Sequence, residues 1–326
     1  MEDNKVIKFG ERVFNFSKEN LPDLPSNMER VTAGNSGESI LIIGSEKTAL
    51  YDCGMAYCGE EILEKIRVAL KKHDRNKLDI IMLSHSHFDH IGALPYIREA
   101  HPEATVYAAE KCMKIFERPN AKALIKKLGE DAREQYGNQE QKAREIKSEG
   151  LKVDIAVKTG DKIHIGKEQY IEVLEAKGHT DCSTNYILHP ENMMFVCEST
   201  GVLKRGNFGL HTAAVKSPLQ CLETAKNCME YDARQLMSIH FGLVPIEYTR
   251  QYFEKYMEMA IEELRAIEKM HKEGKSQEEI VDAYQMAYYN DARKEVQPLS
   301  AFRINASNAI KVAIAEIEEG LLDEYL

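Results

Sequence analysis

The sequence lacks the features of secreted, membrane-spanning and disulfide-stabilised proteins. Residues 1–5 do not show the charged-then-apolar pattern of a signal peptide, and no run of about 18 apolar residues exists that could cross a bilayer. The 7 cysteines are odd in number, and their spacing indicates no disulfide framework. These absences predict a cytoplasmic protein with free thiols in a reducing compartment and no membrane association.

The sequence also lacks an excess of basic residues. Its 43 Lys and Arg are outnumbered by 53 Asp and Glu, which gives a net charge of −10. Because nucleic acids are bound through basic surfaces, this balance argues against a nucleic-acid partner and favours a small-molecule substrate. A length of 326 residues allows one large domain or two. The sequence is also compatible with a homo-oligomer.

One histidine-rich segment stands out, residues 84–90, with the sequence Ser-His-Ser-His-Phe-Asp-His. The apolar run before it, residues 79–83, predicts a buried strand, and residues 91–97 predict the start of a helix. Loops held by such a scaffold often carry chemistry. His85 and His87 are two apart, so in extended backbone they project to the same side. Asp89 and His90 follow at the turn and can point to a second centre beside the first.

Other predicted strands also end at a residue that can bind a metal. These residues are Asp52 after strand 48–51, His179 in a glycine-preceded loop, Glu198 after strand 193–196, and His240 after strand 236–239. We expect them to converge on one rim with the histidine-rich segment.

This pattern resembles the metallo-β-lactamase fold superfamily. The motif His85-x-His87-x-Asp89-His90 is followed by Gly178-His179-Thr180, by the carboxylate Glu198 and by His240, and the order agrees over about residues 28–245. The resemblance implies an α/β fold, an αββα sandwich with a binuclear metal site at one edge of its two sheets. It implies a first metal held by His85, His87 and His179, a second held by Asp89, His90 and His240, a bridge at Glu198, and a hydrogen bond from Asp52 that holds a ligand histidine.

The bridging position departs from the superfamily pattern, where aspartate is usual. Here the strand ends in Cys197-Glu198. Glutamate is one methylene longer, so it can bridge only if its backbone lies farther from the metals. Cys197 is an alternative ligand, and Glu198 is favoured because it occupies the matching position.

The predicted ligand set indicates the metals and the chemistry. Five imidazoles and two carboxylates suit Zn²⁺ first, with Fe²⁺ or Mn²⁺ as alternatives, and are too rich in nitrogen for Mg²⁺ or Ca²⁺. Two such ions about 3.5–4 Å apart can share a water and lower its pKa from ~15.7 toward ~7. The resulting hydroxide would be the nucleophile of a hydrolase, and Asp89 could also relay a proton as a catalytic residue.

Two helical regions are expected beside the sandwich. Residues 110–150 are rich in Lys, Glu, Arg, Gln and Ala, which predicts a helical insertion interrupted near Pro119 and Gly137. The sandwich domain is expected over residues 1–245 and a helical extension over 246–326. In the extension, Ser276 and Glu279 form a capping box that predicts a helix start. In its placement the extension resembles the helical tail of glyoxalase II-like thioesterases.

Candidate contacts for an anionic substrate follow the metal ligands in the chain. They are Lys204, Arg205 and His211 after Glu198, and Arg250 after His240. The favoured function is hydrolysis of an ester, thioester or lactone. A phosphodiesterase or nuclease is disfavoured by acidity. A flavodiiron-like redox protein is disfavoured because it would have glutamate in place of His87. A non-catalytic binding module is disfavoured because it would lack one of the metal-binding residues.

Overall fold

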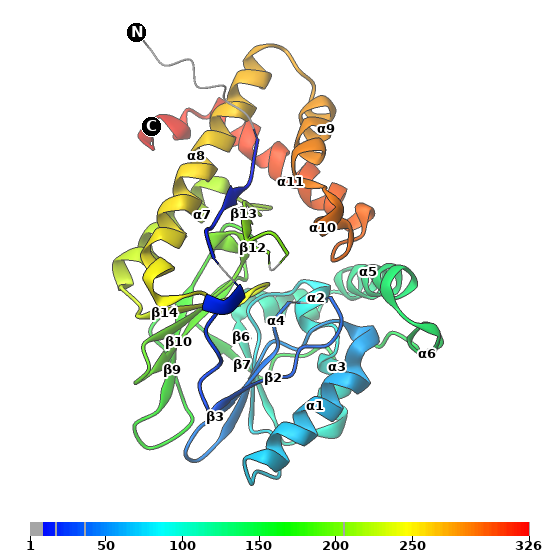
Figure 1. The fold of residues 1–326 in the computed structure, drawn as a ribbon. Coiled ribbons are helices and arrows are strands. Elements are labelled where there is room, and N and C mark those ends of the chain that lie inside the picture. The colour runs from blue at the N-terminus through cyan, green and yellow to red at the C-terminus, as the bar shows by residue number, and fades with distance from the viewer. Residues whose placement is uncertain (1–8, 17, 36, 205, 326) are drawn as a thin grey trace.

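Two sheets packed face to face, with helices on both outer faces, make up most of the computed structural model, which describes residues 9–16, 18–35, 37–204 and 206–325 (Figure 1). The first sheet contains, in spatial order, β2 (Met28–Arg30), β3 (Ile40–Ile43), β4 (Thr48–Tyr51), β5 (Ile80–Met82), β6 (Thr105–Ala109) and β7 (Ile155–Val157). The second contains β15 (Gly242–Leu243), β14 (Gln235–Ser238), β11 (Met193–Val196), β10 (Thr184–His189), β9 (Tyr170–Glu175) and β8 (Lys162–His164). A small sheet joins β1 (Arg12–Val13), β13 (Gly209–His211) and β12 (Val202–Leu203).

Strand direction explains where the helices lie. β4, β5, β6 and β7 run parallel, as do β11 and β14, and parallel neighbours need a crossover connection. The crossovers include α1 (Gly59–Lys72), α3 (Leu94–Ala100) and α7 (Pro218–Tyr231). Short 3-10 helices are η1 (Lys18–Asn20), η2 (Ala56–Cys58), η4 (Ile246–Tyr248) and η5 (Leu321–Glu324).

The sheets meet through an aromatic core. Tyr51 on β4 packs against Phe195 on β11 and Tyr186 on β10, with ring centroids 5.0 and 6.0 Å apart. Side chains alternate between the faces of a strand, so the neighbouring residues point outward. Leu50 thus packs toward the α1 side, whereas Met194 packs toward α7 and α8 (Thr249–Lys272). The expected αββα sandwich is confirmed.

The two helical regions lie outside the sheets, and they meet. The insertion contains α4 (Glu110–Phe116), α5 (Pro119–Tyr136) and α6 (Gln139–Lys142), with breaks at the expected proline and glycine. The extension contains α8, α9 (Gln277–Tyr288), α10 (Asp291–Lys294) and α11 (Leu299–Glu318), and α9 begins at the expected capping box. The Tyr136 hydroxyl donates to the Lys294 carbonyl at 2.9 Å, which links α5 to α10. Figure 1 shows α5 just below α10.

Within the described residues, none of the helices combines the length and apolar character needed to span a membrane. All seven cysteines lie in this part of the chain and are buried, free thiols.

A buried carboxyl group joins the extension to the sandwich. Glu263 on α8 accepts hydrogen bonds from the Thr212 hydroxyl at 2.5 Å and the Tyr288 hydroxyl at 2.8 Å. Burial raises the pKa of Glu263 to about 7. The folded protein therefore binds this proton more tightly than the unfolded chain does.

The Glu263→Gln variant should reveal this proton as a pH-dependent difference in stability. A raised carboxyl pKa contributes stability that is complete below the unfolded pKa and lost as pH rises through about 7. Between about pH 5 and pH 8 we expect the variant to gain about 3 kcal/mol in free energy of unfolding relative to the wild type, measured with urea. Glu258→Gln, at an exposed position of α8, is the control. A wild-type-minus-variant difference that does not change with pH would contradict the assignment.

Candidate metal centre

The histidine-rich segment leaves the first sheet directly after β5. His85 lies in the loop after the strand, and α2 (Phe88–Ile91) begins after His87, its N-terminal capping residue, whose backbone is extended. Asp89 and His90 lie within α2, so the helical turn points them in a different direction from the two preceding histidines. The end of one parallel strand thus supplies two separate groups of ligands.

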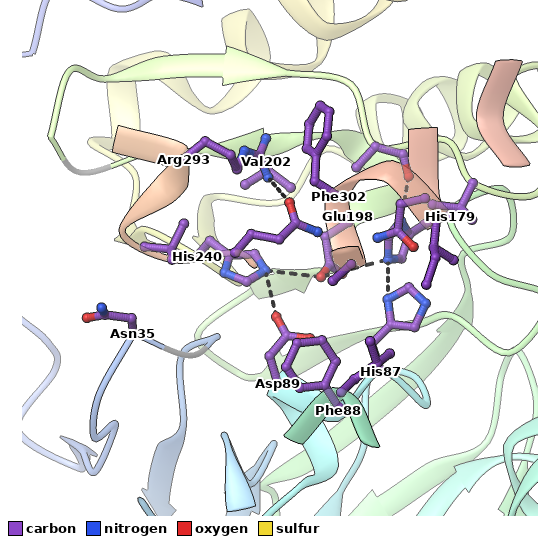
Figure 2. Close-up of a pocket in the computed structure, with 18 of the residues that line it drawn as sticks. Asn35, His87, Phe88, Asp89, His179, Glu198, Val202, His240, Arg293 and Phe302 are labelled. Carbon is purple, nitrogen blue, oxygen red and sulfur yellow. Dashed lines mark hydrogen bonds and ion pairs between the residues drawn. The ribbon is translucent and has the colours of Figure 1, made fainter. Parts of the chain in front are cut away.

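His87 and Asp89 line a pocket of about 700 Å³ (Figure 2). Its polar side contains His87, Asp89, His179, Glu198 and His240. Its apolar sides come from the insertion and the extension. They include Leu124, Ile125 and Leu128 of α5 and Ala301, Phe302 and Ala306 of α11.

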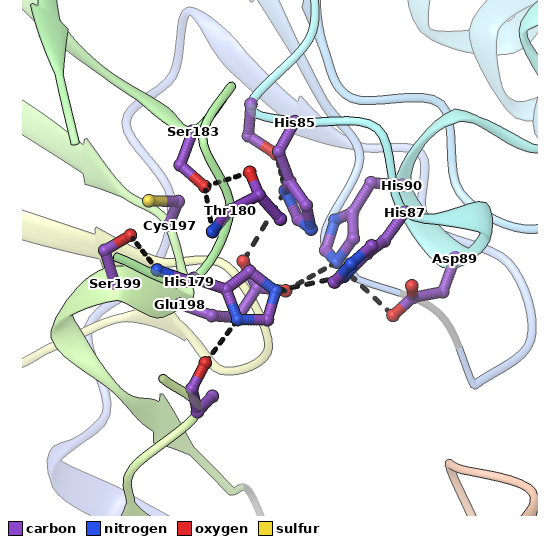
Figure 3. A network of polar contacts seen from close by, with 12 residues as sticks. His85, His87, Asp89, His90, His179, Thr180, Ser183, Cys197, Glu198 and Ser199 are labelled. Atoms are coloured by element: carbon purple, nitrogen blue, oxygen red, sulfur yellow. Dashed lines mark hydrogen bonds and ion pairs between the residues drawn. The ribbon is translucent and has the colours of Figure 1, made fainter. Parts of the chain in front are cut away.

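Three overlapping groups in the described part of the chain could each hold a metal ion. They are His85, His87 and His179; His85, His90 and Glu198; and Asp89, His90 and His240. Figure 3 shows the histidine rings turned toward one another. The structure therefore brings together all seven residues of the predicted ligand set.

In the first group, outer hydrogen bonds fix which nitrogen faces inward. His179 Nδ1 donates to the Ala213 carbonyl at 2.5 Å, which leaves Nε2 facing His87 Nδ1 at 3.0 Å. His85 Nδ1 lies 2.9 Å from the Ser84 hydroxyl, and its Nε2 has no hydrogen-bond partner among the described residues. A metal-binding imidazole is commonly held in this way through its second nitrogen.

Asp52 orients histidines of both ligand groups from the side that faces away from the cluster. It accepts hydrogen bonds from the Ser84 amide and hydroxyl, both at 2.7 Å, and from His90 Nδ1 at 3.1 Å. Because the Ser84 hydroxyl donates to Asp52, it accepts from His85. Asp52 has a φ of 52°, a backbone conformation that is uncommon outside glycine and clusters at functional sites. One buried carboxylate therefore orients His90 directly and His85 through Ser84.

Glu198 reaches both groups. It begins the 3-10 helix η3 (Glu198–Thr200) directly after Cys197, and its Oε1 lies 2.8 Å from His90 Nε2, 3.1 Å from His240 Nε2 and 3.9 Å from His179 Nε2. The extra methylene thus does not prevent contact with both sides. The Cys197 thiol instead faces the Ala176 carbonyl at 3.8 Å in the core between the sheets, so the structure does not support it as a ligand (Figure 3).

The electrostatics favour the metal-binding protonation state at some of these groups. At His90 burial alone would lower the pKa, but Asp89 and Glu198 raise it well above its ordinary value. Burial lowers the pKa of His87 to about 3 and that of His85 well below its ordinary value, so both imidazoles are neutral. Burial alone would raise the pKa of Glu198, but His85 and His90 hold it well below its ordinary range. Glu198 Oε2 also lacks a hydrogen-bond partner among the described residues, an arrangement that is costly unless a cation binds there. The residues present therefore fit divalent metal ions.

The structure brings some of the candidate substrate contacts to the pocket and leaves others away from it. Lys204 and His211 line the pocket. His211 Nδ1 donates to the Val202 carbonyl at 2.7 Å. Arg205 lies outside the described residues. Arg250 is not brought to the pocket, because it lies on the exposed side of α8 and pairs with Glu254 at 3.0 Å.

Sequence reasoning did not identify Arg293, a buried residue of α10 that lines the same pocket. Its segment, residues 291–295, is mostly charged and gives no pattern that predicts burial. The sequence also gives no indication of the hydrogen bond that links α5 to α10.

The family model of the metallo-beta-lactamase superfamily matches residues 33–235. The match covers more than half of the chain and includes every predicted ligand except His240. The chain belongs to the metallo-beta-lactamase superfamily.

Solved structures agree on the fold. A metallo-beta-lactamase family protein of Thermus thermophilus has a TM-score of 0.63 at 16% identity, over 91% of this chain and 95% of that one. A beta-lactamase domain protein of Burkholderia ambifaria has a TM-score of 0.62 at 12% identity, over 92% and 88%. The sec-alkylsulfatase Pisa1 of Pseudomonas sp. has a TM-score of 0.61 at 14% identity, over 89% of this chain and 49% of that one.

One curated relative is named as an oxidase. The coenzyme F420H(2) oxidase of Methanocaldococcus jannaschii is 35% identical over 78 residues, 24% of this chain. The match spans only 19% of that oxidase.

The His87→Ala variant should lose metal. His87 supplies one of three imidazoles in the first group, so we expect the metal content of the purified protein to fall by about one ion per chain or more. Elemental analysis measures this directly. His164→Ala, at an exposed position of β8, is the control. Unchanged metal content in the His87 variant would show that the ligand assignment is wrong.

The Asp52→Asn variant should keep all the metal-binding side chains but bind metal less tightly. The amide cannot accept all three hydrogen bonds of the carboxylate, and loss of such outer partners costs about 10–100-fold in metal affinity. Competition with a chromophoric chelator gives the affinity. The exposed Asp291→Asn is the control. Equal affinity in wild type and Asp52→Asn would rule out the orienting role.

Proposed function

We propose that the protein is a binuclear metal-dependent hydrolase that acts on an ester, thioester or lactone. One observation carries the proposal: two ligand groups joined by Glu198 lie at a large pocket that also has apolar walls from α5 and α11. Such a site can place a carbonyl at the metals and an apolar chain against α5 and α11. Zinc is the first choice of metal, with iron or manganese as alternatives.

The chemistry of the metals and that of the chain are separate contributions. Two bound ions would supply an activated water and polarise the substrate's carbonyl oxygen. Asp89 Oδ2 lies 3.3 Å from His90 Nε2 and 3.8 Å from His240 Nε2. Burial alone would raise the pKa of Asp89, but His90 and His240 hold it well below its ordinary range, so its ionised carboxylate would accept a proton from the reacting water. Phe302 and Leu128 line the apolar side and would shield a bound substrate from bulk water.

An oxidoreductase is the second candidate, favoured by the similarity to the F420H(2) oxidase. His87 argues against an oxidoreductase, because flavodiiron proteins have glutamate at this position of the metal-binding motif. A nuclease is disfavoured by the net charge of −10. We also propose a cytoplasmic location, supported by the seven free thiols, and a small-molecule substrate.

Hydrolysis should depend on the metals. Against a panel of 4-nitrophenyl esters, thioesters, lactones and a phosphodiester, we expect the wild type to hydrolyse a carboxylic ester, thioester or lactone. Dialysis against a chelator should lower the rate at least 100-fold, and Zn²⁺ should restore it. Undiminished activity after metal removal, phosphodiesters as the preferred substrates, or oxidation of a reduced cofactor without hydrolysis would each overturn the proposal.

A further inference from the structure

Arg293 is a buried cation facing the pocket that contains the metal centre. Its side chain belongs to α10, is 8% exposed and lines the pocket. Figure 2 shows it beside Val202 and on the same side of the pocket as His240.

Within the described residues, Arg293 forms no ion pair. Nη1 donates to the neutral amide oxygen of Gln297 at 3.2 Å, and Nε has no hydrogen-bond partner. No carboxylate of the described residues lies within ion-pair distance of the guanidinium group. Burial lowers the pKa of Arg293 to about 10, so the group is still charged at neutral pH. A buried charge without a partner is costly, and an anion would remove that cost.

The other cationic side chains that line the described pocket already have partners. Arg30 donates to Glu38 at 2.8 Å. Lys204 pairs with Glu11 and also contacts Asn290 at 3.4 Å. Arg293 is therefore the cation in this part of the chain that is left to meet a ligand.

The geometry of the guanidinium group indicates what kind of anion fits. Nη1 is used by Gln297, whereas neither Nε nor Nη2 donates to a described residue. Nε is closed off from solvent, so an anion in the pocket would meet the guanidinium group at Nη2, through one charged hydrogen bond that a carboxylate oxygen can accept. Asp89, Glu198 and Glu295 also line the pocket, so a single cation suits a monoanion better than a dianionic phosphate.

We propose that Arg293 binds a carboxylate at the far end of the substrate, so that the enzyme acts on esters or thioesters whose acyl chain ends in a carboxylate. The chain between the two ends would lie against Phe302 of α11 and the apolar side chains of α5. This inference rests on the proposed hydrolytic function and narrows its substrate class.

The kinetic test compares two substrates of matched length, the mono-4-nitrophenyl ester of glutaric acid and neutral 4-nitrophenyl pentanoate. In Arg293→Gln we expect KM for the carboxylate substrate to rise about 10–100-fold, the effect of a lost charged hydrogen bond, with kcat/KM for the neutral ester within about 3-fold of wild type. The control is Arg303→Gln, an arginine paired with Asp282 on the surface of the extension. Equal losses on both substrates, or no preference of the wild type for the carboxylate, would overturn the proposal.

A binding measurement keeps this test separate from the hydrolytic proposal. Calorimetric titration of the metal-loaded protein with glutarate should give a Kd at least 10-fold weaker for Arg293→Gln than for wild type, whether or not any ester is hydrolysed. A carboxylate that binds only the metals would bind both proteins equally, which contradicts the role of Arg293. Arginine-dependent binding of sulfate that is tighter than that of glutarate would overturn the carboxylate assignment.

Discussion

The structure depends on the orientation of a buried cluster of imidazoles and carboxylates. Asp52, Ser84 and the Ala213 carbonyl contact the outer nitrogens of three histidines, so among the described residues the inner nitrogens face one another and the carboxylates of Glu198 and Asp89. Without a cation, several buried lone pairs stay unsatisfied, which folded proteins rarely tolerate. Metal binding would explain how such a cluster can be buried.

The sandwich positions the metal-binding residues, and the helical regions shape the rest of the pocket. The ends of strands from both sheets position the ligands, and the packing of Tyr51 against Phe195 and Tyr186 fixes one sheet relative to the other. The pocket beyond the metals is shaped by α5 and α11, segments far apart in the sequence that are linked through Tyr136 and α10. Changes in these helices would thus alter the pocket without moving the ligand cluster.

Local patterns made the fold and the ligand cluster accessible from the sequence. The apolar strand before His85, the break at Pro119 and the capping box at Ser276 are all set by neighbours in the chain. The pocket was less accessible because it depends on tertiary packing. Arg250 follows His240 closely in sequence, yet α8 turns it to the surface, whereas Arg293 is buried only because the extension folds back over the site. Likewise, only the fold shows that Cys197 faces the core and Glu198 the pocket.

The most direct test of the binuclear centre is anomalous diffraction from crystals of the purified protein, recorded at the zinc, iron and manganese absorption edges. The account predicts two peaks about 3.5–4 Å apart, one among His85, His87 and His179 and one among Asp89, His90 and His240, with Glu198 between them. A protein of full metal content whose anomalous peaks lie elsewhere, or a cluster that remains empty after metal loading, would contradict it.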